Sequence, residues 1–431
     1  MKKGEKKQSR MWVLLAVGII VLGCIAVLSF TGLPFEQAAA HFLTGSSSSP
    51  QHTAANASTT HAISTPSVAE STNGVNGGSP SPSPALTQAP SSTPTATPSP
   101  QKMVAYHGPV EHIFFHPLIA YPELAFDGDS MTKGYDDWFV TIPEFNKIID
   151  SLYRNNYILI PIDSIYETKT IDGKMTATRK DLTLPEGKKP LILSIDDNNY
   201  YDYMRKNGNI NKLVLDENGE VAGYAIDPKG AEVTARDNDI IPILDDFVKA
   251  HPDFSFQGAK GVIALTGYEG ILGYRTNETG AADYAETKAA ALKVVSRLKE
   301  TGWTFASHGW GHKDAGKISE KVLFADTDRW LKEVGSLLGP TPVYIYPYGA
   351  SVPEGSPKMK GLQDRGFAVF CSVGPAPYLK ASSGVVMMDR RHIDGLSLND
   401  DVKRLAPLFD ATVVIDPIRP SVKAKLATAN K

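Results

Sequence analysis

The chain has 431 residues, a formal net charge of −3 and two cysteines, Cys24 and Cys371. Its 44 basic and 47 acidic residues give no overall positive field, so we expect no nucleic-acid partner. The two cysteines lie in unrelated segments, which excludes a disulfide framework and a cysteine-based metal centre. The length fits two or three average domains, or one large α/β domain with appendages.

The N-terminus has the pattern of a membrane anchor. Residues 1–10 are a basic tail, and the uncharged apolar run 11–33 is long enough to cross a hydrocarbon core of ~30 Å. Because basic residues precede this run and none follows it closely, we expect a single-pass cell-membrane protein whose head is extracellular. Two alternatives stay open: cleavage after Ala38-Ala39-Ala40, and lipidation at Cys24.

Residues 44–101 consist mostly of Ser, Thr, Pro, Ala, Gly and Asn, with Glu70 as the only formally charged residue. Such a segment cannot bury enough apolar surface to fold, so we predict a disordered linker. Together with the anchor, it suggests a head that works at some distance from the bilayer.

From residue 103 to 431, apolar strands alternate with helical patterns. Near-continuous apolar strands separated by helices predict a parallel α/β sheet covered on both faces, which can close into a barrel. One helix begins at Thr141 with a capping box to Glu144, and two later helices are expected to end at Gly302 and Gly339. The predicted strands are 112–119, 158–162, 190–196, 261–266, 303–307, 342–346, 367–373 and 385–388. Residues 212–226 read instead as a hairpin with its turn at Asn218-Gly219, within a long insertion at 198–260.

Functional residues of parallel α/β barrels lie at the carboxyl ends of strands. One predicted strand ends in Asp196-Asp197, two adjacent carboxylates that repel each other unless a cation lies beside them. Another ends in "SHGWGH", which brings His308 and His312. Two histidines and one carboxylate are a common ligand set for catalytic zinc, so we predict a divalent metal, Zn²⁺ foremost, at this end of the sheet.

Two further strand ends add candidates. The turn Pro347-Tyr348-Gly349 follows one strand and is suited to aim a backbone N–H at a developing oxyanion. Another strand leads to His392, next to Arg390 and Arg391.

The ordered motifs "SIDD", "SHGWGH", "YPYG" and a late histidine resemble the polysaccharide deacetylases of the NodB-homology group, carbohydrate esterase family 4, over about residues 110–400. The stretches "HIFFHPL" and "LKETGWTFASHGWGH" also look like this family. The resemblance implies a distorted (β/α)7 barrel. It implies that Asp196 is the general base and His392 the general acid, and that the Tyr348 N–H helps to stabilise the oxyanion. The implied metal ligands are Asp197, His308 and His312.

The chain departs from the family pattern at several positions. Asn198 stands where the first motif usually has glycine, and Ile345 stands where the third usually has an arginine that orients the base. Arg390 and Arg391 are the candidates to replace that guanidinium. The Asp-Trp pair of the fourth motif has no clear counterpart. Trp310 and Tyr348 are candidate stacking surfaces for a sugar ring, with a packing role as the alternative for both.

We therefore expect a metal-dependent deacetylase that acts on an N-acetylated cell-wall or extracellular polysaccharide. One alternative is an esterase that removes O-acetyl groups with the same residues. Another is a non-catalytic, wall-associated carbohydrate-binding module on the same fold. The intact Asp/Asp/His/His set favours an enzyme, and the absence of HExxH disfavours a metalloprotease.

Overall fold

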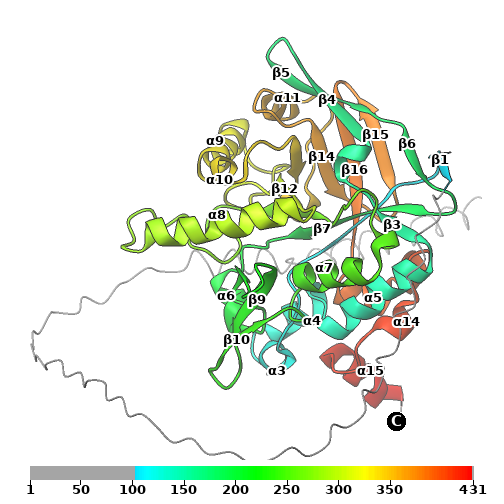
Figure 1. Cartoon of the computed structure of the whole chain (residues 1–431), viewed down its shortest axis with the longest axis vertical. Helices are drawn as coiled ribbons and strands as arrows, with labels where there is room; N and C mark the ends of the chain where they lie inside the picture. Colours follow the sequence, from blue (N-terminus) through cyan, green and yellow to red (C-terminus); the bar gives the residue numbers. More distant parts are fainter. Residues whose placement is uncertain (1–101, 430–431) are drawn as a thin grey trace, which may run out of the picture. The chain divides into compact units, whose positions relative to one another are not determined.

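The computed structural model describes residues 102–429, and Figure 1 shows their arrangement. Seven parallel strands close into a barrel, because β7 pairs with β2 on one edge and with β11 on the other. The α/β class and the closed barrel are thus confirmed. In order around the ring, the strands are β11 (Val262–Leu265), β12 (Thr304–Ser307), β13 (Val343–Ile345), β14 (Val369–Val373), β16 (Val385–His392), β2 (Glu111–Phe115) and β7 (Lys189–Asp196).

The predicted strand 158–162 lies beside the ring rather than in it. It forms β3 (Tyr157–Leu159), which pairs with the first residues of β7, while β11 pairs with the last residues along the same edge. The prediction 112–119 was too long, since β2 stops at Phe115. Pro117 follows closely and has no N–H to donate to a neighbouring strand. β16 was predicted too short, and it runs on to His392.

Both faces of the barrel strands are buried. Along β7, Leu191, Leu193 and Ile195 belong to the larger apolar cluster, which includes residues of the surrounding helices, whereas Ile192 belongs to a second cluster. Side chains of a strand alternate between its faces, so residues 192, 194 and 196 share one face. This explains why the strands read as continuous apolar runs.

Helices surround the barrel. α5 begins with the predicted capping box, in which Thr141 accepts from the Glu144 N–H and the Glu144 carboxylate accepts from the Thr141 N–H. Gly302 and Gly339 follow their helices with φ of 96° and 79°, as expected of helix-ending glycines. The longest helices are α5 (Ile142–Arg154), α7 (Ile240–Ala250), α8 (Tyr284–Glu300) and α9 (Glu320–Trp330). After α9 come a π turn at Leu331–Gly335, α10 (Ser336–Leu338) and the shorter α11 (Pro357–Gln363).

The predicted hairpin is present as β8 (Lys212–Leu215) and β9 (Val221–Ile226), with Gly219 at φ 75°. A third strand, β10 (Glu232–Ala235), extends it. The sequence did not indicate the other antiparallel pieces: β1 (Met103–Tyr106) with β6 (Leu182–Pro185), β4 (Tyr166–Ile171) with β5 (Lys174–Arg179), and β15 (Tyr378–Ser382) on β16.

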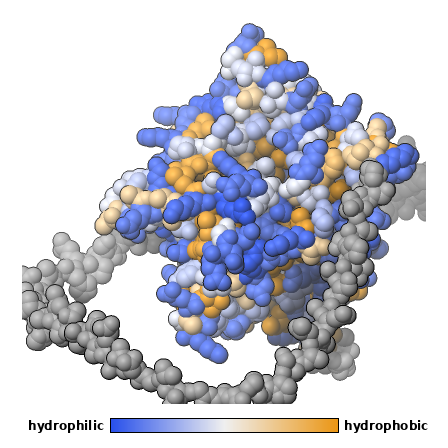
Figure 2. Space-filling view, in the orientation of Figure 1, coloured by the Kyte–Doolittle hydropathy of each residue, from blue (hydrophilic) through white to orange (hydrophobic). Residues whose placement is uncertain are grey.

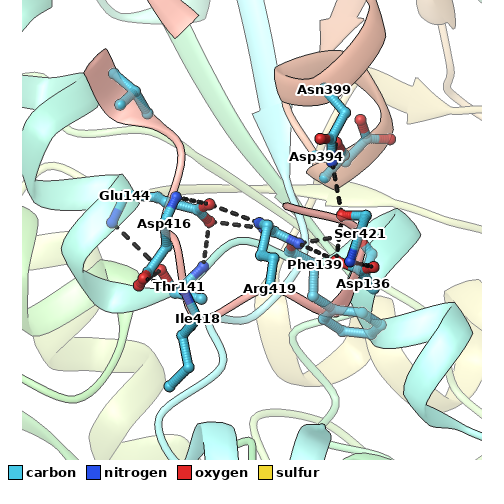
Figure 3. Close-up of polar contacts among 12 residues, drawn as sticks. Asp136, Phe139, Thr141, Glu144, Asp394, Asn399, Asp416, Ile418, Arg419 and Ser421 are labelled. Carbon is cyan, nitrogen blue, oxygen red and sulfur yellow. Dashed lines mark hydrogen bonds and ion pairs between the residues drawn. The ribbon is translucent and has the colours of Figure 1, made fainter. Parts of the chain in front are cut away.

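Short helices and the C-terminal segment complete the domain. The fully buried Arg419 donates to both Glu144 carboxylate oxygens and to the backbone carbonyl groups of Asp136 and Phe139 (Figure 3). This network fastens the C-terminal segment to α4 and α5. The short helices are α3 (Pro122–Ala125), α4 (Thr132–Trp138), α6 (Asp202–Lys206), α12 (Gly395–Asp400), α13 (Val402–Leu405) and α14 (Ala411–Val414), followed by α15 (Pro420–Ala429) and joined by 3₁₀ turns at Ile162–Ser164, Pro252–Phe254 and Pro347–Gly349.

The face drawn in Figure 2 is largely hydrophilic, with hydrophobic residues between the polar ones. Within residues 102–429, no helix has both the length and the apolar character needed to cross a membrane. The predicted basic tail, anchor and linker lie outside the described residues.

Candidate active site

The two adjacent carboxylates reach the same site because the backbone changes direction between them. Asp196 ends β7, and Asp197 follows it with a left-handed φ of 58°. Consecutive residues of a regular strand point to opposite faces, so this φ permits both side chains to face the end of the barrel. They are 3% and 6% exposed. A left-handed aspartate is costly, and such backbone strain concentrates at functional sites.

Arg390 supplies the guanidinium that Ile345 cannot. Its Nη1 lies 2.7 Å from Asp196 Oδ1 and its Nη2 lies 2.9 Å from Oδ2, so the pair is bidentate. Burial alone would raise the pKa of Asp196, but the charges of Arg390 and His308 and the hydrogen bonds from Arg390 outweigh it and hold this pKa well below its usual range. Ile345 packs in the barrel core, and Arg391 pairs instead with Glu111 at 3.1 Å.

Asp197, His308 and His312 form the predicted ligand cluster. Each offers one ligand atom, and the three atoms lie within 4.8 Å of one another. His312 Nε2 is 3.7 Å from Asp197 Oδ2. Ligand atoms bound at about 2.0–2.2 Å around one tetrahedral zinc ion are separated by roughly 3.4 Å, so small movements suffice to bring these atoms around an ion.

The protonation of the cluster suits a cation. His308 Nδ1 is 2.9 Å from the Ile345 carbonyl oxygen, so Nδ1–H donates to it and Nε2 is the ring nitrogen left to act as a ligand. Burial lowers the pKa of His312 to about 4, although Asp197 opposes this shift, so His312 is neutral at pH 7. Imidazole nitrogens and a carboxylate oxygen are donors that divalent transition metals accept. The residues therefore fit a metal ion.

Tyr201 holds the carboxylate of this cluster. Its hydroxyl lies 2.7 Å from Asp197 Oδ1 and 2.6 Å from Thr266 Oγ1. With Oδ1 engaged in this way, Oδ2 is the oxygen that faces the histidines. Sequence reasoning missed Tyr201, because nothing in the motif indicates that the loop folds back on the aspartate.

His392 lies beside the cluster in a chain of polar contacts. Its Nδ1 is 2.9 Å from Asp394 Oδ2, and its Nε2 is 3.2 Å from His116 Nδ1. His116 Nε2 is in turn 3.9 Å from Asp197 Oδ2. The His392 ring stacks on Phe114 at 4.3 Å. His116 thus lies between His392 and the cluster.

Asp394 and His116 were missed as functional residues, although each had a signal. Asp394 follows His392 by two residues, and its buried carboxylate fixes the imidazole. His116 belongs to the stretch "HIFFHPL", immediately after β2, which is the strand that pairs with both β7 and β16. Both neighbours of β2 carry site residues at their carboxyl ends. A polar residue at the carboxyl end of β2 is therefore a site candidate as well.

The remaining predicted residues have different surroundings. Pro347 and Tyr348 form a 3₁₀ turn, in which Tyr348 has a φ of 60° and its ring meets His312 edge-on at 4.5 Å. Trp310 donates from Nε1 to Glu333 at 2.7 Å, and the Arg329 guanidinium lies 3.3 Å from its ring centroid. These contacts agree with the packing alternative for Trp310. Asn198 is buried and donates to the Tyr200 hydroxyl.

No family model and no curated protein matches the chain. Among solved structures, the domain is similar to polysaccharide deacetylases. The Streptococcus pyogenes deacetylase PplD in complex with acetate has 15% identity and a TM-score of 0.37, over 67% of this chain and 93% of that one. The putative polysaccharide deacetylase BA0330 from Bacillus anthracis has 13% identity and a TM-score of 0.38, over 66% and 65%.

A third match is BA3943 from Bacillus anthracis, a pseudoenzyme of carbohydrate esterase family 4, with 8% identity and a TM-score of 0.23, over 39% of this chain and 54% of that one. At these identities the matches bear on the fold alone. A shared fold does not establish catalysis, so any activity has to be argued from the residues of the site.

Proposed function

We propose that this protein is a metal-dependent hydrolase that removes N-acetyl groups from the amino sugars of a cell-wall or extracellular polysaccharide. One observation carries the proposal: the buried carboxylate of Asp196, ionised by Arg390, lies beside a separate Asp–His–His ligand cluster. An amide hydrolase that activates water needs both parts, a base and a cation site, within reach of one substrate carbonyl.

Asp197, His308 and His312 would hold the metal, for which we propose Zn²⁺. When bound, the ion polarises the acetamide carbonyl and lowers the pKa of a water molecule toward about 7. A set of three protein ligands is typical of catalytic rather than structural zinc sites.

Asp196 is proposed as the general base. Because Arg390 keeps Asp196 ionised, the carboxylate is unprotonated over the whole physiological pH range, as a general base must be before it takes a proton. His308 Nε2 lies 3.8 Å from Asp196 Oδ2, so base and ligand cluster are adjacent. The Tyr348 N–H is proposed to donate to the oxyanion. The contact between the Tyr348 ring and His312 supports this proposal, because the turn that contains Tyr348 then lies next to the ligand cluster.

His392 is proposed as the proton source for the leaving amine, acting with His116. Asp394 accepts the N–H of His392 Nδ1, and His392 Nε2 faces His116 Nδ1. In the proposed step His392 carries a proton on each ring nitrogen: its Nε2 proton passes to His116 Nδ1, and His116 gives up its own Nε2 proton to the departing amine. His116→Gln and His392→Gln should therefore each lower the rate without removing the metal.

Acetate release tests the proposed function. The full-length protein should release acetate from N-acetylglucosamine oligomers or from peptidoglycan, and a chelator should abolish this release. Asp196→Asn serves as the matched control for contaminating activity. Release from O-acetylated but not from N-acetylated sugars would instead identify an esterase, and no release from any of these polymers would contradict the proposal.

We also propose that residues 11–33 are a retained membrane anchor and that 44–101 are a linker to an extracellular head. The basic tail and the uncharged apolar run support this topology. Protease added to intact cells should then release the head by cutting within 44–101. A head that is protected, or that is found free with a new N-terminus near His41, would contradict it.

A further inference from the structure

The loop that carries both histidine ligands is held by a carboxylate from outside the motif. Asp326, on α9, accepts from the Trp310 N–H at 2.7 Å through Oδ2 and from the Gly311 N–H at 3.0 Å through Oδ1. Asp326 is 7% exposed. One buried carboxylate thus binds two successive amides between His308 and His312.

The contact with Asp326 explains why "SHGWGH" has glycine at positions 309 and 311. A Cβ at Gly309 would lie 3.0 Å from Asp326 Oδ2, and one at Gly311 would lie 3.1 Å from Oδ1. Gly309 also has a φ of 66°, which disfavours any other residue. Both glycines therefore permit the carboxylate to approach the backbone.

Trp310, in the middle of this loop, is held by residues of α9 and the π turn after it on one side and by the loop at 267–268 on the other. Arg329 covers the Trp310 ring, and Glu333 accepts from its Nε1. On the other side, the Trp310 carbonyl accepts from the Gly267 and Tyr268 N–H groups at 2.9 and 3.1 Å. The loop is therefore held from both sides before it turns, at φ 48°, into His312.

We propose that Asp326 is a positioning residue for the metal site: its carboxylate sets the Trp310-Gly311 backbone so that His312 lies against Asp197 and His308. Without these two hydrogen bonds, the strained His312 backbone is free to relax and its imidazole leaves the cluster. The inference rests on the proposed metal site, and it assigns a role to a residue 14 positions beyond the motif.

The first test is the affinity of the full-length protein for Zn²⁺, measured by competition with a chelating dye. Asp326→Asn keeps the size of the side chain but replaces one acceptor oxygen by an NH₂ group that faces an N–H. Loss of an outer partner of a ligand typically weakens metal binding about 10- to 100-fold, and we expect a loss in this range. The visible spectrum of the Co²⁺-loaded variant should also change, since it reports coordination geometry.

Asp328→Asn is the matched control. It lies two residues away on α9 and pairs with Arg365 at the surface. It should leave the metal affinity and the Co²⁺ spectrum unchanged. Thermal unfolding of both variants without metal measures any general loss of stability, which a purely structural role of Asp326 would produce without a change in affinity.

A double-mutant cycle makes the test specific to this contact. Gly311→Ala should weaken metal binding in the wild type, because the new methyl group presses on Asp326, but should add little in Asp326→Ala, where the obstacle is gone. Additive effects would overturn the inference, as would wild-type affinity in Asp326→Asn. A wild-type protein that binds no metal would overturn the proposed function itself and the inference with it.

Discussion

Within residues 102–429, two fully buried arginines, Arg390 and Arg419, each bind a carboxylate, and the two carboxylates differ in what else they accept. Arg419 binds Glu144, whose two oxygens also accept the N–H groups of Asp416 and Thr141. Arg390 binds Asp196, and each oxygen of that carboxylate accepts one guanidinium N–H. Both guanidinium groups are fully buried.

The difference distinguishes a structural carboxylate from a reactive one. Four N–H donors occupy Glu144, so it has no capacity left for a substrate, and Figure 3 shows it enclosed by the C-terminal segment. Asp196 is oriented and ionised by Arg390, yet it keeps lone pairs for a water molecule. The same ion-pair chemistry therefore fastens the fold in one place and prepares a base in the other.

The largest effect on rate should come from Asp196→Asn. Loss of a general base typically costs about 10²- to 10⁴-fold, and we expect acetate release to fall in this range. Glu144→Gln provides the comparison: it should destabilise the fold but leave the rate per folded molecule close to that of the wild type. Strong residual activity in Asp196→Asn would remove this residue from the mechanism.

The largest effect on stability should come from Arg419→Met. Removing one partner of a buried ion pair leaves an uncompensated charge and typically costs about 3–5 kcal/mol, here at Glu144. Urea unfolding measures the change in the free energy of unfolding. Arg365→Met is the control, because it breaks the more exposed pair with Asp328 and should cost only about 0.2–1 kcal/mol. Equal losses in the two variants would mean that the Arg419 network adds nothing special.

A smaller effect on rate is expected from Arg390→Lys. Lysine keeps the positive charge but not the two parallel hydrogen bonds to Asp196. A hydrogen bond to a charged group contributes about 1.5–3 kcal/mol, which corresponds to roughly 10- to 150-fold in rate if it is needed only during the reaction. We expect a lower kcat with the metal retained. A rate equal to that of the wild type would show that charge alone prepares the base.

The smallest effect should come from Thr141→Ala, which removes the side-chain half of the α5 cap next to Glu144. Losing an N-cap hydroxyl typically costs about 1 kcal/mol. The thermal midpoint should fall slightly and acetate release should not change. A loss of activity would indicate that the Glu144 region is coupled to the site.

The sequence predicted the features that lie within short motifs. Seven barrel strands, the α5 cap and the cluster of Asp197, His308 and His312 follow from local patterns: apolar runs, a capping box and ligands at strand ends. The position of β3 outside the barrel could not be predicted, because an apolar strand has the same sequence pattern whether it lies in the barrel or beside it.

Residues that act across the fold were harder to predict. The choice between Arg390 and Arg391 was left open, yet strand periodicity decides it: residues 390 and 392 share one face of β16, so a site that contains His392 also receives Arg390. Asp326 and Tyr201 could not be predicted, because their contacts depend on how a helix and a loop pack against the motifs.

The roles of the two adjacent aspartates are the central claim, and the metal content of two full-length variants tests it most directly. Metal analysis should find about one divalent ion per chain in the wild type and in the nearly inactive Asp196→Asn, and little in Asp197→Asn. Loss of the metal in both variants to the same degree would contradict the account, because the two carboxylates would then act as a joint ligand and the base would lie elsewhere.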